Sequence, residues 1–440
     1  MTEKLSEENK LIAFTDALSR LPNRRALLAR LEELGGQQRP APDLLAVVFI
    51  DLDGFKLVND SYGHEVGDLL IKTASAELEA IRPDDATLVR IGGDEFALLA
   101  EGNDAGRRAE QFARGALRAL TLPMMLQGKQ VKIGASIGYA SDDTGDVKPL
   151  ELLRRADTAM YSVKATGRGR TQAYDPGLDA ERARRRKVGQ EIAGGLARCE
   201  FDVVYQPIID ARVLSVSGVE ALVRWPGRPE GPLSPDEFIE IAESNGMIQA
   251  LGMFVLERAC RDTAGISGLR LSVNVSPAQL SHPEFERQVT DILALTGFPP
   301  ERLQLEITER NLIEHPERAR QSIAALQQAG VTFALDDFGT GFTSLAYLRS
   351  YGFTCVKIDR SLIKQLETDP KAVYLISGLI QMSKGLDLKV VAEGVETAQL
   401  ARMLRTSGCN ELQGYYYGRP GELSAIFSAA SPKASVRNTA

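Results

Sequence analysis

The sequence is poor in cysteine and histidine, and each shortage argues against a class of protein. Its 440 residues include four cysteines, which lie far apart and form no CxxC pair. Neither a disulfide framework nor a zinc site is therefore expected, and the thiols should be free in a reducing cytoplasm. The three histidines, His64, His282 and His315, lack the spacing of metal ligands.

Long apolar runs and an excess of basic charge are also missing. No stretch approaches the roughly 20 apolar residues that cross a bilayer, and the charged start MTEKLSEENK has no apolar core of a signal peptide. The net charge of -7 and the pI near 5.4 disfavour a nucleic-acid polymer as a partner, because phosphate backbones attract basic surfaces. We therefore expect a cytoplasmic protein without membrane insertion.

The first part of the chain, residues 1–173, predicts an α+β domain. Residues 1–20 form a polar lead-in that ends in a short helix. Strand and helix patterns then alternate, and the hairpin sequence RIGGDEFALL lies at 90–99. This order predicts a central mixed sheet covered by helices. Residues 174–197 include the charged run DPGLDAERARRRKVGQ and predict a largely helical linker.

The second part of the chain, residues 186–430, predicts an α/β domain. About eight strand patterns, most of them separated by helical patterns, are typical of a single (β/α)8 barrel. The opening strands are joined without an obvious helix, so we expect an imperfect barrel in which one strand can run antiparallel. Residues 431–440 are expected to be a disordered tail.

Acidic side chains gather at the hairpin of the first domain. A buried strand runs into Asp51, and Gly92-Gly93 allow a tight turn that carries Asp94 and Glu95. Two bare carboxylates about 4 Å apart repel by about 4 kcal/mol at an effective dielectric constant of about 20, so a hard cation such as Mg²⁺ would resolve their meeting. A solvated polar turn is the alternative for any single hairpin of this kind.

Other side chains of the first domain suit a nucleotide. Basic groups available for phosphates are Lys56, Lys164 and Arg168. An amide and a carboxylate, those of Asn59 and Asp68, offer the donors and acceptors that complement guanine.

In the second domain, polar groups recur where apolar strands end. They are Glu220, Asn274, Glu306, Asp336, Asp337, Lys357, Asp359 and Glu393. The carboxyl ends of barrel strands meet at one mouth, where barrel enzymes keep their chemistry. One such acid is more often a cap or a turn residue, whereas a cluster from five strands would be unstable without cations. Two divalent metal ions would neutralise it and supply a hydroxide for attack on a phosphodiester.

The first domain resembles the GGDEF family of diguanylate cyclases over about residues 10–173. Five motifs occur in order: LPNRR, FIDLDGFKLVNDSYGHEVGD, RIGGDEF, ASIGYA and AMYSVKATGRGR. The resemblance implies a palm domain like that of nucleotidyl cyclases. It also implies that two GTP, one on each subunit of a homodimer, condense to cyclic di-GMP with one or two Mg²⁺ (or Mn²⁺) ions per site. An RxxD pattern, 82–85, lies one residue further from the hairpin than is usual for the family's inhibitory site, and whether it works stays open.

The GGDEF resemblance also implies roles by position. Asp51, Asp94 and the Leu52 carbonyl would bind metal, and Glu95 would assist catalysis. Asn59 and Asp68 would contact guanine. Phosphate would be contacted by Lys56, Lys164 and Arg168.

The second domain resembles the EAL family of cyclic di-GMP phosphodiesterases over about residues 186–428. The motifs are VEALVRW, SVNVS, LEITE, LDDFGTGFTSL, VKIDRSLI, VVAEGVET and LQGYYYGRP. The resemblance implies a modified TIM (β/α)8 barrel that binds two Mg²⁺ (or Mn²⁺) ions. The implied metal ligands are Glu220, Asn274, Glu306, Asp336 and Asp337, with Asp359 and Glu393 completing or supporting the set.

Further roles follow from the EAL resemblance. Lys357 would activate or orient the water, with Glu220 acting beside it in catalysis, and Arg224 and Gln413 would contact substrate. Two acids would support the site from outside the ligand set: Glu396, and Glu309, which would brace the loop DFGTGFTSL.

Three functions remain open from the sequence. The chain could be a bifunctional enzyme whose phosphodiesterase dominates, with GTP at the first domain stimulating the second. It could act mainly as a cyclase, or it could be a non-catalytic cyclic di-GMP receptor or scaffold. In each case the expected ligands are cyclic di-GMP and GTP, and an unknown sensor or effector protein could supply the regulation.

Overall fold

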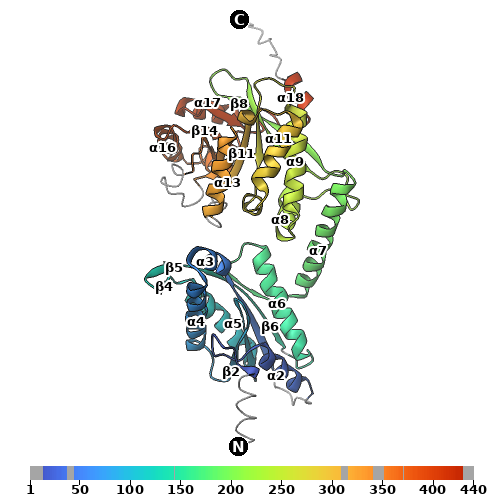
Figure 1. Cartoon of the computed structure of the whole chain (residues 1–440), viewed down its shortest axis with the longest axis vertical. Helices are drawn as coiled ribbons and strands as arrows, with labels where there is room; N and C mark the ends of the chain where they lie inside the picture. The colour runs from blue at the N-terminus through green and yellow to red at the C-terminus, as the bar shows by residue number, and fades with distance from the viewer. Residues whose placement is uncertain are drawn as a thin grey trace, which may run out of the picture. The chain divides into compact units, whose positions relative to one another are not determined.

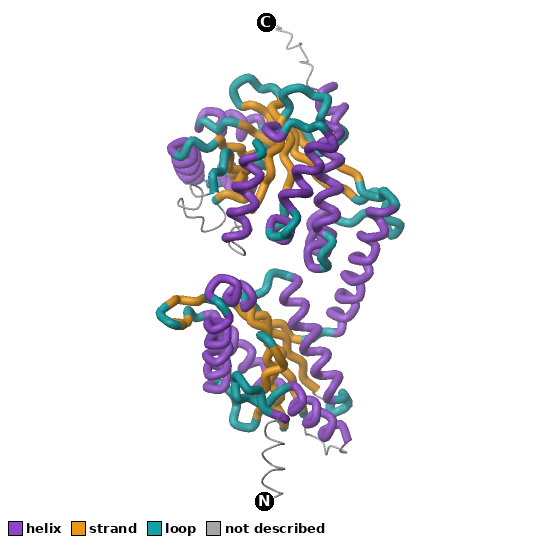
Figure 2. Tube along the Cα trace, viewed as in Figure 1, coloured by secondary structure: helices purple, strands orange, loops and turns teal. Residues whose placement is uncertain are grey.

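The computed structural model describes residues 13–36, 44–142, 144–308, 316–339, 351–369 and 371–429. The predicted tail, Glu309 and most of the predicted lead-in lie outside these residues. The chain divides into two compact units, Met1–Lys187 and Val188–Ala440. Figure 1 labels many of the elements of both units, and Figure 2 colours helices and strands differently.

The first unit is built on a mixed sheet. Its described strands are β1 (Leu45–Asp53), β2 (Ala86–Gly92), β3 (Glu95–Glu101), β6 (Gly134–Asp142) and β7 (Thr171–Ala173), in the order β2-β3-β1-β6-β7. The central strand β1 is antiparallel to β3 and β6, whereas β7 is parallel to β6. A separate two-stranded ribbon joins β4 (Met124–Leu126) to β5 (Lys129–Val131).

Helices cover both faces of this sheet. The helices on the sheet are α2 (Arg24–Gly36), α4 (His64–Ala80), α5 (Ala105–Thr121) and α6 (Pro149–Ala165), and α3 (Phe55–Tyr62) packs against α4. The helix α7 (Pro176–Ala197) follows β7 and spans the boundary between the two units. Because side chains alternate along a strand, Val48 and Ile50 of β1 pack with α4 and α5, while Val47 and Phe49 pack in a second core with α2 and α6. The predicted mixed sheet covered by helices is confirmed.

The described strands of the second unit close into a barrel, in the order β10-β11-β12-β13-β14-β15-β8-β9. Their bounds are β8 (Asp202–Asp210), β9 (Val216–Arg224), β10 (Arg270–Asn274), β11 (Leu303–Thr308), β12 (Thr332–Phe338), β13 (Cys355–Ile358), β14 (Lys389–Ala392) and β15 (Glu411–Gln413). Strand β8 is antiparallel to both of its neighbours, β9 and β15. The predicted imperfect barrel is thus confirmed, and its antiparallel strand is the opening one.

Helices surround the barrel. They are α8 (Pro235–Ser244), α9 (Ile248–Thr263), α10 (Pro277–Leu280), α11 (Phe285–Thr296), α13 (Pro316–Gln328), α15 (Arg360–Gln365), α16 (Ala372–Gly385), α17 (Ala398–Ser407) and α18 (Leu423–Ala429), with a short 3-10 turn η1 (Pro300–Arg302). Strands β9 to β15 run parallel from one neighbour to the next, so their carboxyl ends form one mouth. Within the described residues, none of the helices has both the length and the apolarity of a membrane span.

Candidate active sites

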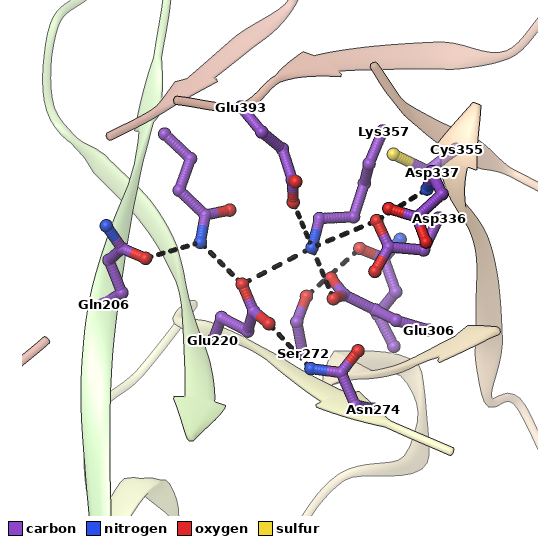
Figure 3. Close-up of polar contacts among 12 residues, drawn as sticks. Gln206, Glu220, Ser272, Asn274, Glu306, Asp336, Asp337, Cys355, Lys357 and Glu393 are labelled. Atoms are coloured by element: carbon purple, nitrogen blue, oxygen red, sulfur yellow. Dashed lines mark hydrogen bonds and ion pairs between the residues drawn. The ribbon is translucent and has the colours of Figure 1, made fainter. Parts of the chain in front are cut away.

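The barrel mouth gathers the polar side chains that were expected there. Glu220 lies on β9, Asn274 ends β10, Glu306 lies on β11 and Asp336 lies on β12. Parallel pairing brings them to one end of the barrel with a stagger: Asn274 is the register partner of Glu306, whereas Asp336 pairs with Thr308, two residues beyond Glu306. Such a stagger is expected where the strands of a barrel are tilted. Figure 3 shows these side chains converging from separate strands.

The Lys357 ammonium of β13 occupies the centre of this cluster (Figure 3). Its Nζ lies 2.6 Å from a carboxylate oxygen of Glu306 and 2.6 Å from one of Glu393. Glu220 is 3.4 Å away and Asp336 is 3.7 Å away. The side chain is 1% exposed, so one buried cation faces four described carboxylates.

Glu220 is held by amide groups on both of its oxygens. Asn274 Nδ2 donates to Oε1 at 2.7 Å, and Gln413 Nε2 donates to Oε2 at 2.6 Å. The same Gln413 nitrogen donates to Gln206 Oε1 at 3.1 Å. Sequence reasoning missed Gln206; the available signal was a polar residue in an apolar strand, placed opposite Glu220 in the antiparallel register.

Burial and charge shift the titration of this cluster. Burial raises the pKa of Glu306 and that of Glu393 to about 8, although the Lys357 ammonium opposes the shift. Burial would also raise the pKa of Glu220, but the ammonium and two amide hydrogen bonds bring it below its ordinary value. For Lys357, desolvation disfavours the charge, yet the surrounding carboxylates raise its pKa well above the ordinary value.

A β-bulge makes Asp336 and Asp337 neighbours at the mouth, since successive strand residues would otherwise point to opposite faces. The pairing register of β12 shifts between Leu335 and Phe338, and Asp337 has a positive φ of 55°. The Asp337 N–H donates to Asp336 Oδ1 at 3.0 Å. Asp359 has a second task, because its Oδ1 accepts the Ser361 N–H at 2.9 Å and caps α15.

The donors of the barrel mouth fit a hard divalent cation in their chemistry. They are carboxylate and amide oxygens, which Mg²⁺ prefers, and Glu306 Oε1 is buried without a hydrogen-bond partner in the described part of the chain. In the same part of the chain, no group of three or more acidic, histidine or cysteine side chains is arranged to hold a metal ion as it stands. Cation binding would therefore require the carboxylates to turn from Lys357 toward the ion.

A cavity of about 740 Å³ opens above the acids, a size typical of small-molecule sites. Its lining includes Asp337, Asp359, Arg224, Gln413 and Glu396. Burial lowers the pKa of the Arg224 guanidinium, and its Nη1 donates to the Val223 carbonyl at 2.8 Å. Glu396 is exposed and lies 3.6 Å from Lys364 Nζ.

A second acidic site lies where β1 ends and the β2–β3 hairpin turns. Asp51 is 6% exposed, and it is the register partner of Glu95 across β1 and β3. The Leu52 N–H donates to the Asp94 carbonyl at 3.2 Å. The sheet thus brings together the predicted acids of the first domain. Burial, and then the Asp51 charge, raise the pKa values of Asp94 and Glu95.

The Arg90 side chain holds the β2–β3 hairpin turn by hydrogen bonds to its backbone. Its Nε and Nη2 donate to the Gly93 carbonyl at 3.1 and 2.7 Å, and its Nη1 lies 2.8 Å from Asp16 Oδ1. Gly93 has a φ of 54°, a conformation that glycine adopts at little cost. Sequence reasoning did not identify Arg90 or Asp16 as support for the turn.

The predicted nucleotide contacts of the first unit are only partly engaged with the acids. Lys164 Nζ lies 2.5 Å from Asp51 Oδ2. Asn59 approaches α4 closely, since a Cβ at Gly67 would lie 1.8 Å from its Oδ1. Lys56, Asp68 and Arg168 are exposed to solvent.

Comparison with known protein families and relatives follows the same division of the chain. Residues 13–170 match the family model described as diguanylate cyclase, GGDEF domain, and residues 189–420 match that of the EAL domain. A bifunctional diguanylate cyclase/cyclic di-GMP phosphodiesterase of Pseudomonas aeruginosa, MucR, is 35% identical over 415 residues, which are 93% of this chain and 60% of MucR. The cyclic di-GMP phosphodiesterase NbdA of the same organism is 35% identical over 405 residues, 89% of this chain and 52% of NbdA.

A solved structure of one of these relatives also resembles the barrel unit of this chain. The MucR phosphodiesterase in complex with cyclic di-GMP, from Pseudomonas aeruginosa, has a TM-score of 0.52 and 33% identity, and covers 55% of this chain and 99% of its own. Across the first five curated relatives, this chain spans between 49% and 60% of their length.

Proposed function

The chain belongs to the family of proteins in which a GGDEF domain precedes an EAL domain, and from this premise we propose that its second unit hydrolyses cyclic di-GMP to linear pGpG. The observation that carries the proposal is the convergence of Glu220, Glu306, Asp336 and Glu393 around one buried ammonium. Every metal position expected from the EAL pattern retains an oxygen-bearing side chain. The size of the adjoining cavity suits a small molecule such as a cyclic dinucleotide.

The residues of the barrel mouth have three proposed roles: binding metal ions, supplying a positive charge and contacting the substrate. The acids of β9, β11 and β12, with Asn274, would hold two Mg²⁺ or Mn²⁺ ions, and Asp337, Asp359 and Glu393 would complete or support the set. Bound there, such ions lower the pKa of water and offset charge on a phosphodiester. Lys357 adds a positive charge that would orient the water and stabilise negative charge on the phosphate oxygens. Arg224 and Gln413 face the cavity and would contact the substrate.

Turnover of cyclic di-GMP by the full chain tests this proposal. Linear pGpG should appear with Mg²⁺ or Mn²⁺ and should be absent when a chelator removes the ions. Glu220→Gln keeps the size of the side chain but removes its charge, and hydrolysis should fall by at least about 10²-fold. The matched control is Glu257→Gln on the surface of α9, which should leave the rate unchanged. A chain that binds cyclic di-GMP tightly without cleaving it would instead be a receptor.

For the first unit, we propose GTP binding and synthesis of cyclic di-GMP. The supporting observation is the meeting of Asp51, Asp94 and Glu95 at one turn, with Lys164 beside them. The acids, with the Leu52 carbonyl, would hold one or two Mg²⁺ ions. Asn59 and Asp68 would read guanine, while Lys56, Lys164 and Arg168 would contact phosphate. Joining two GTP requires two such sites face to face, so this activity implies a homodimer.

Blocking the hydrolase exposes the synthase. A Glu220→Ala chain incubated with GTP and Mg²⁺ should accumulate cyclic di-GMP, because the product is no longer removed. Adding Asp51→Asn to that chain should abolish the accumulation. If the Glu220→Ala chain yields no cyclic di-GMP at any protein concentration, the synthase proposal fails while the hydrolase proposal stands.

A further inference from the structure

Asp53, the last residue of β1, is a partly buried carboxylate near the proposed nucleotide site, and no role has been assigned to it above. It lies two residues beyond Asp51, so both side chains point to the same face of the sheet. Its side chain is 11% exposed. The opposite residue on β6 is Gly134, and a Cβ there would lie 3.1 Å from Asp53 Oδ2, so the missing side chain leaves room for the carboxylate.

Both oxygens of Asp53 accept hydrogen bonds from the protein. Ser136 Oγ, on β6, donates to Oδ1 at 2.8 Å. The Gly169 N–H, in the turn between α6 and β7, donates to Oδ2 at 3.1 Å. The Arg168 Nε lies 3.9 Å from Oδ1. These contacts indicate that Asp53 holds the turn that contains Arg168 and Gly169.

The turn that Asp53 contacts has an unfavourable backbone conformation. Three successive residues have positive φ: Gly167 at 117°, Arg168 at 59° and Gly169 at 64°. For a residue other than glycine, such a φ is unfavourable, and it persists only where surrounding contacts enforce it. The enforcing contacts are the Asp53–Gly169 bond and the Arg168 N–H, which donates to the Val163 carbonyl at 2.9 Å.

This turn carries the basic groups that the nucleotide would meet. Lys164 lies in the last turn of α6 with its ammonium 2.5 Å from Asp51, and Arg168 follows within the turn. We propose that Asp53 is a positioning residue for phosphate binding in the first unit: it anchors the 167–169 turn in its left-handed conformation and so fixes Arg168 beside the end of β1. The inference rests on the proposed GTP site and adds a residue that does not itself touch the nucleotide.

The anchor and the charge of Asp53 can be separated by substitution. Asp53→Ala removes the acceptor of the Gly169 N–H and frees the turn. Asp53→Asn keeps an oxygen for Gly169, and its amide can donate to Ser136 Oγ, so the turn should stay anchored although the charge near Arg168 is lost. A matched control is Asp142→Ala, at the opposite end of β6, where a buried carboxylate accepts three N–H groups of its own turn.

Binding of two ligands to the full chain gives the deciding measurement. With Mg²⁺ present, calorimetry compares guanosine with guanosine 5′-(α,β-methylene)triphosphate, an analogue that cannot cyclise. Asp53→Ala should weaken the analogue by about tenfold or more, as expected when a positioned charged group is released, and leave guanosine unchanged. Asp53→Asn should keep most of the affinity, and Asp142→Ala should keep both affinities.

Hydrogen exchange provides a readout that needs no nucleotide. The amides of 166–170 should exchange faster in Asp53→Ala than in the wild type, and Asp53→Asn should restore the protection. An Asp53→Ala chain with the wild-type ratio of affinities, or with an equal loss for both ligands, would overturn the positioning role. A wild-type chain that does not bind the triphosphate analogue would refute the proposed GTP site instead, and the exchange data would still decide whether Asp53 anchors the turn.

Discussion

Replacing Lys357 with methionine tests the charge arrangement of the barrel mouth most directly. The substitution keeps a long apolar stem but removes an ammonium that lies within 3.7 Å of four described carboxylates. Removing one partner of a buried ion pair costs about 3–5 kcal/mol, because the remaining charge is left uncompensated. We therefore expect Lys357→Met to lower the free energy of unfolding of the metal-free barrel by about that amount.

Divalent ions should reverse this loss. If the acids bind Mn²⁺, the ion replaces the missing positive charge, and an ion at 100 times its dissociation constant stabilises by about 2.7 kcal/mol. The wild type should gain less than the variant, because its ammonium competes with the ion for the same oxygens. The difference between variant and wild type should thus shrink in Mn²⁺.

The chain carries a convenient probe and a matched control for this measurement. Its single tryptophan, Trp225, is 3% exposed in the barrel core, so selectively excited fluorescence during urea unfolding reports on the second unit. Arg270→Met removes another, partly buried cation of the barrel, which pairs with Glu411 through two contacts of 2.9 and 2.5 Å. Its destabilisation should not depend on Mn²⁺. Equal urea midpoints for Lys357→Met with and without Mn²⁺ would refute a cation site among these acids.

Three further outcomes are expected. Glu220→Gln should lower the rate of pGpG formation, measured by chromatography, by at least about 10²-fold, while cyclic di-GMP still binds through the rest of the cavity. Burial raises the pKa of Glu306 and Glu393 to about 8, so between their ordinary pKa of 4.5 and pH 8 the folded metal-free chain holds protons that the unfolded chain releases. The free energy of unfolding of the metal-free chain should therefore fall as the pH rises through this interval. The affinity for Mn²⁺, measured by calorimetry, should rise over the same interval, because protons no longer compete with the ion. Asn59→Ala should reduce the preference for GTP over ATP in competition binding, because the guanine edge loses its amide partner; an unchanged preference would remove Asn59 from the guanine site.

The architecture and the positions of the acids were readable from the sequence because they depend on periodic patterns. About eight strand patterns, most of them separated by helical patterns, predicted the barrel, and polar residues at the strand ends predicted its mouth. The opening strands, joined without an obvious helix, predicted that one strand could run antiparallel, and this strand is β8. The Gly92-Gly93 pair predicted the hairpin, where glycine takes the positive φ that the turn requires. These signals are local, so one sequence contains them in full.

Other features depend on contacts between distant residues and could not be read in this way. In the sequence Arg90 is an ordinary strand residue, and only the structure shows that its side chain contacts Gly93 and Asp16. Asp359 is a different case, because its cap on α15 is a local contact; what the sequence leaves open is whether the same carboxylate can also bind a metal ion. Gln206 can be recognised as part of the site only from the pairing of β8 with β9, which places it opposite Glu220.

Both units place a lysine where a metal ion is proposed. Lys164 contacts Asp51 in the first unit, and Lys357 contacts the acids of the second. Because clustered carboxylates repel, a resident ammonium stabilises each cluster while no ion is bound. Lysine suits this role better than arginine: its compact charge sits on a flexible stem and can withdraw when a divalent ion takes its place, whereas a planar guanidinium would keep a bidentate grip on the oxygens. The ammonium would then remain close enough to meet the negative charge of a phosphate, so one side chain would serve the metal-free cluster and the substrate complex in turn.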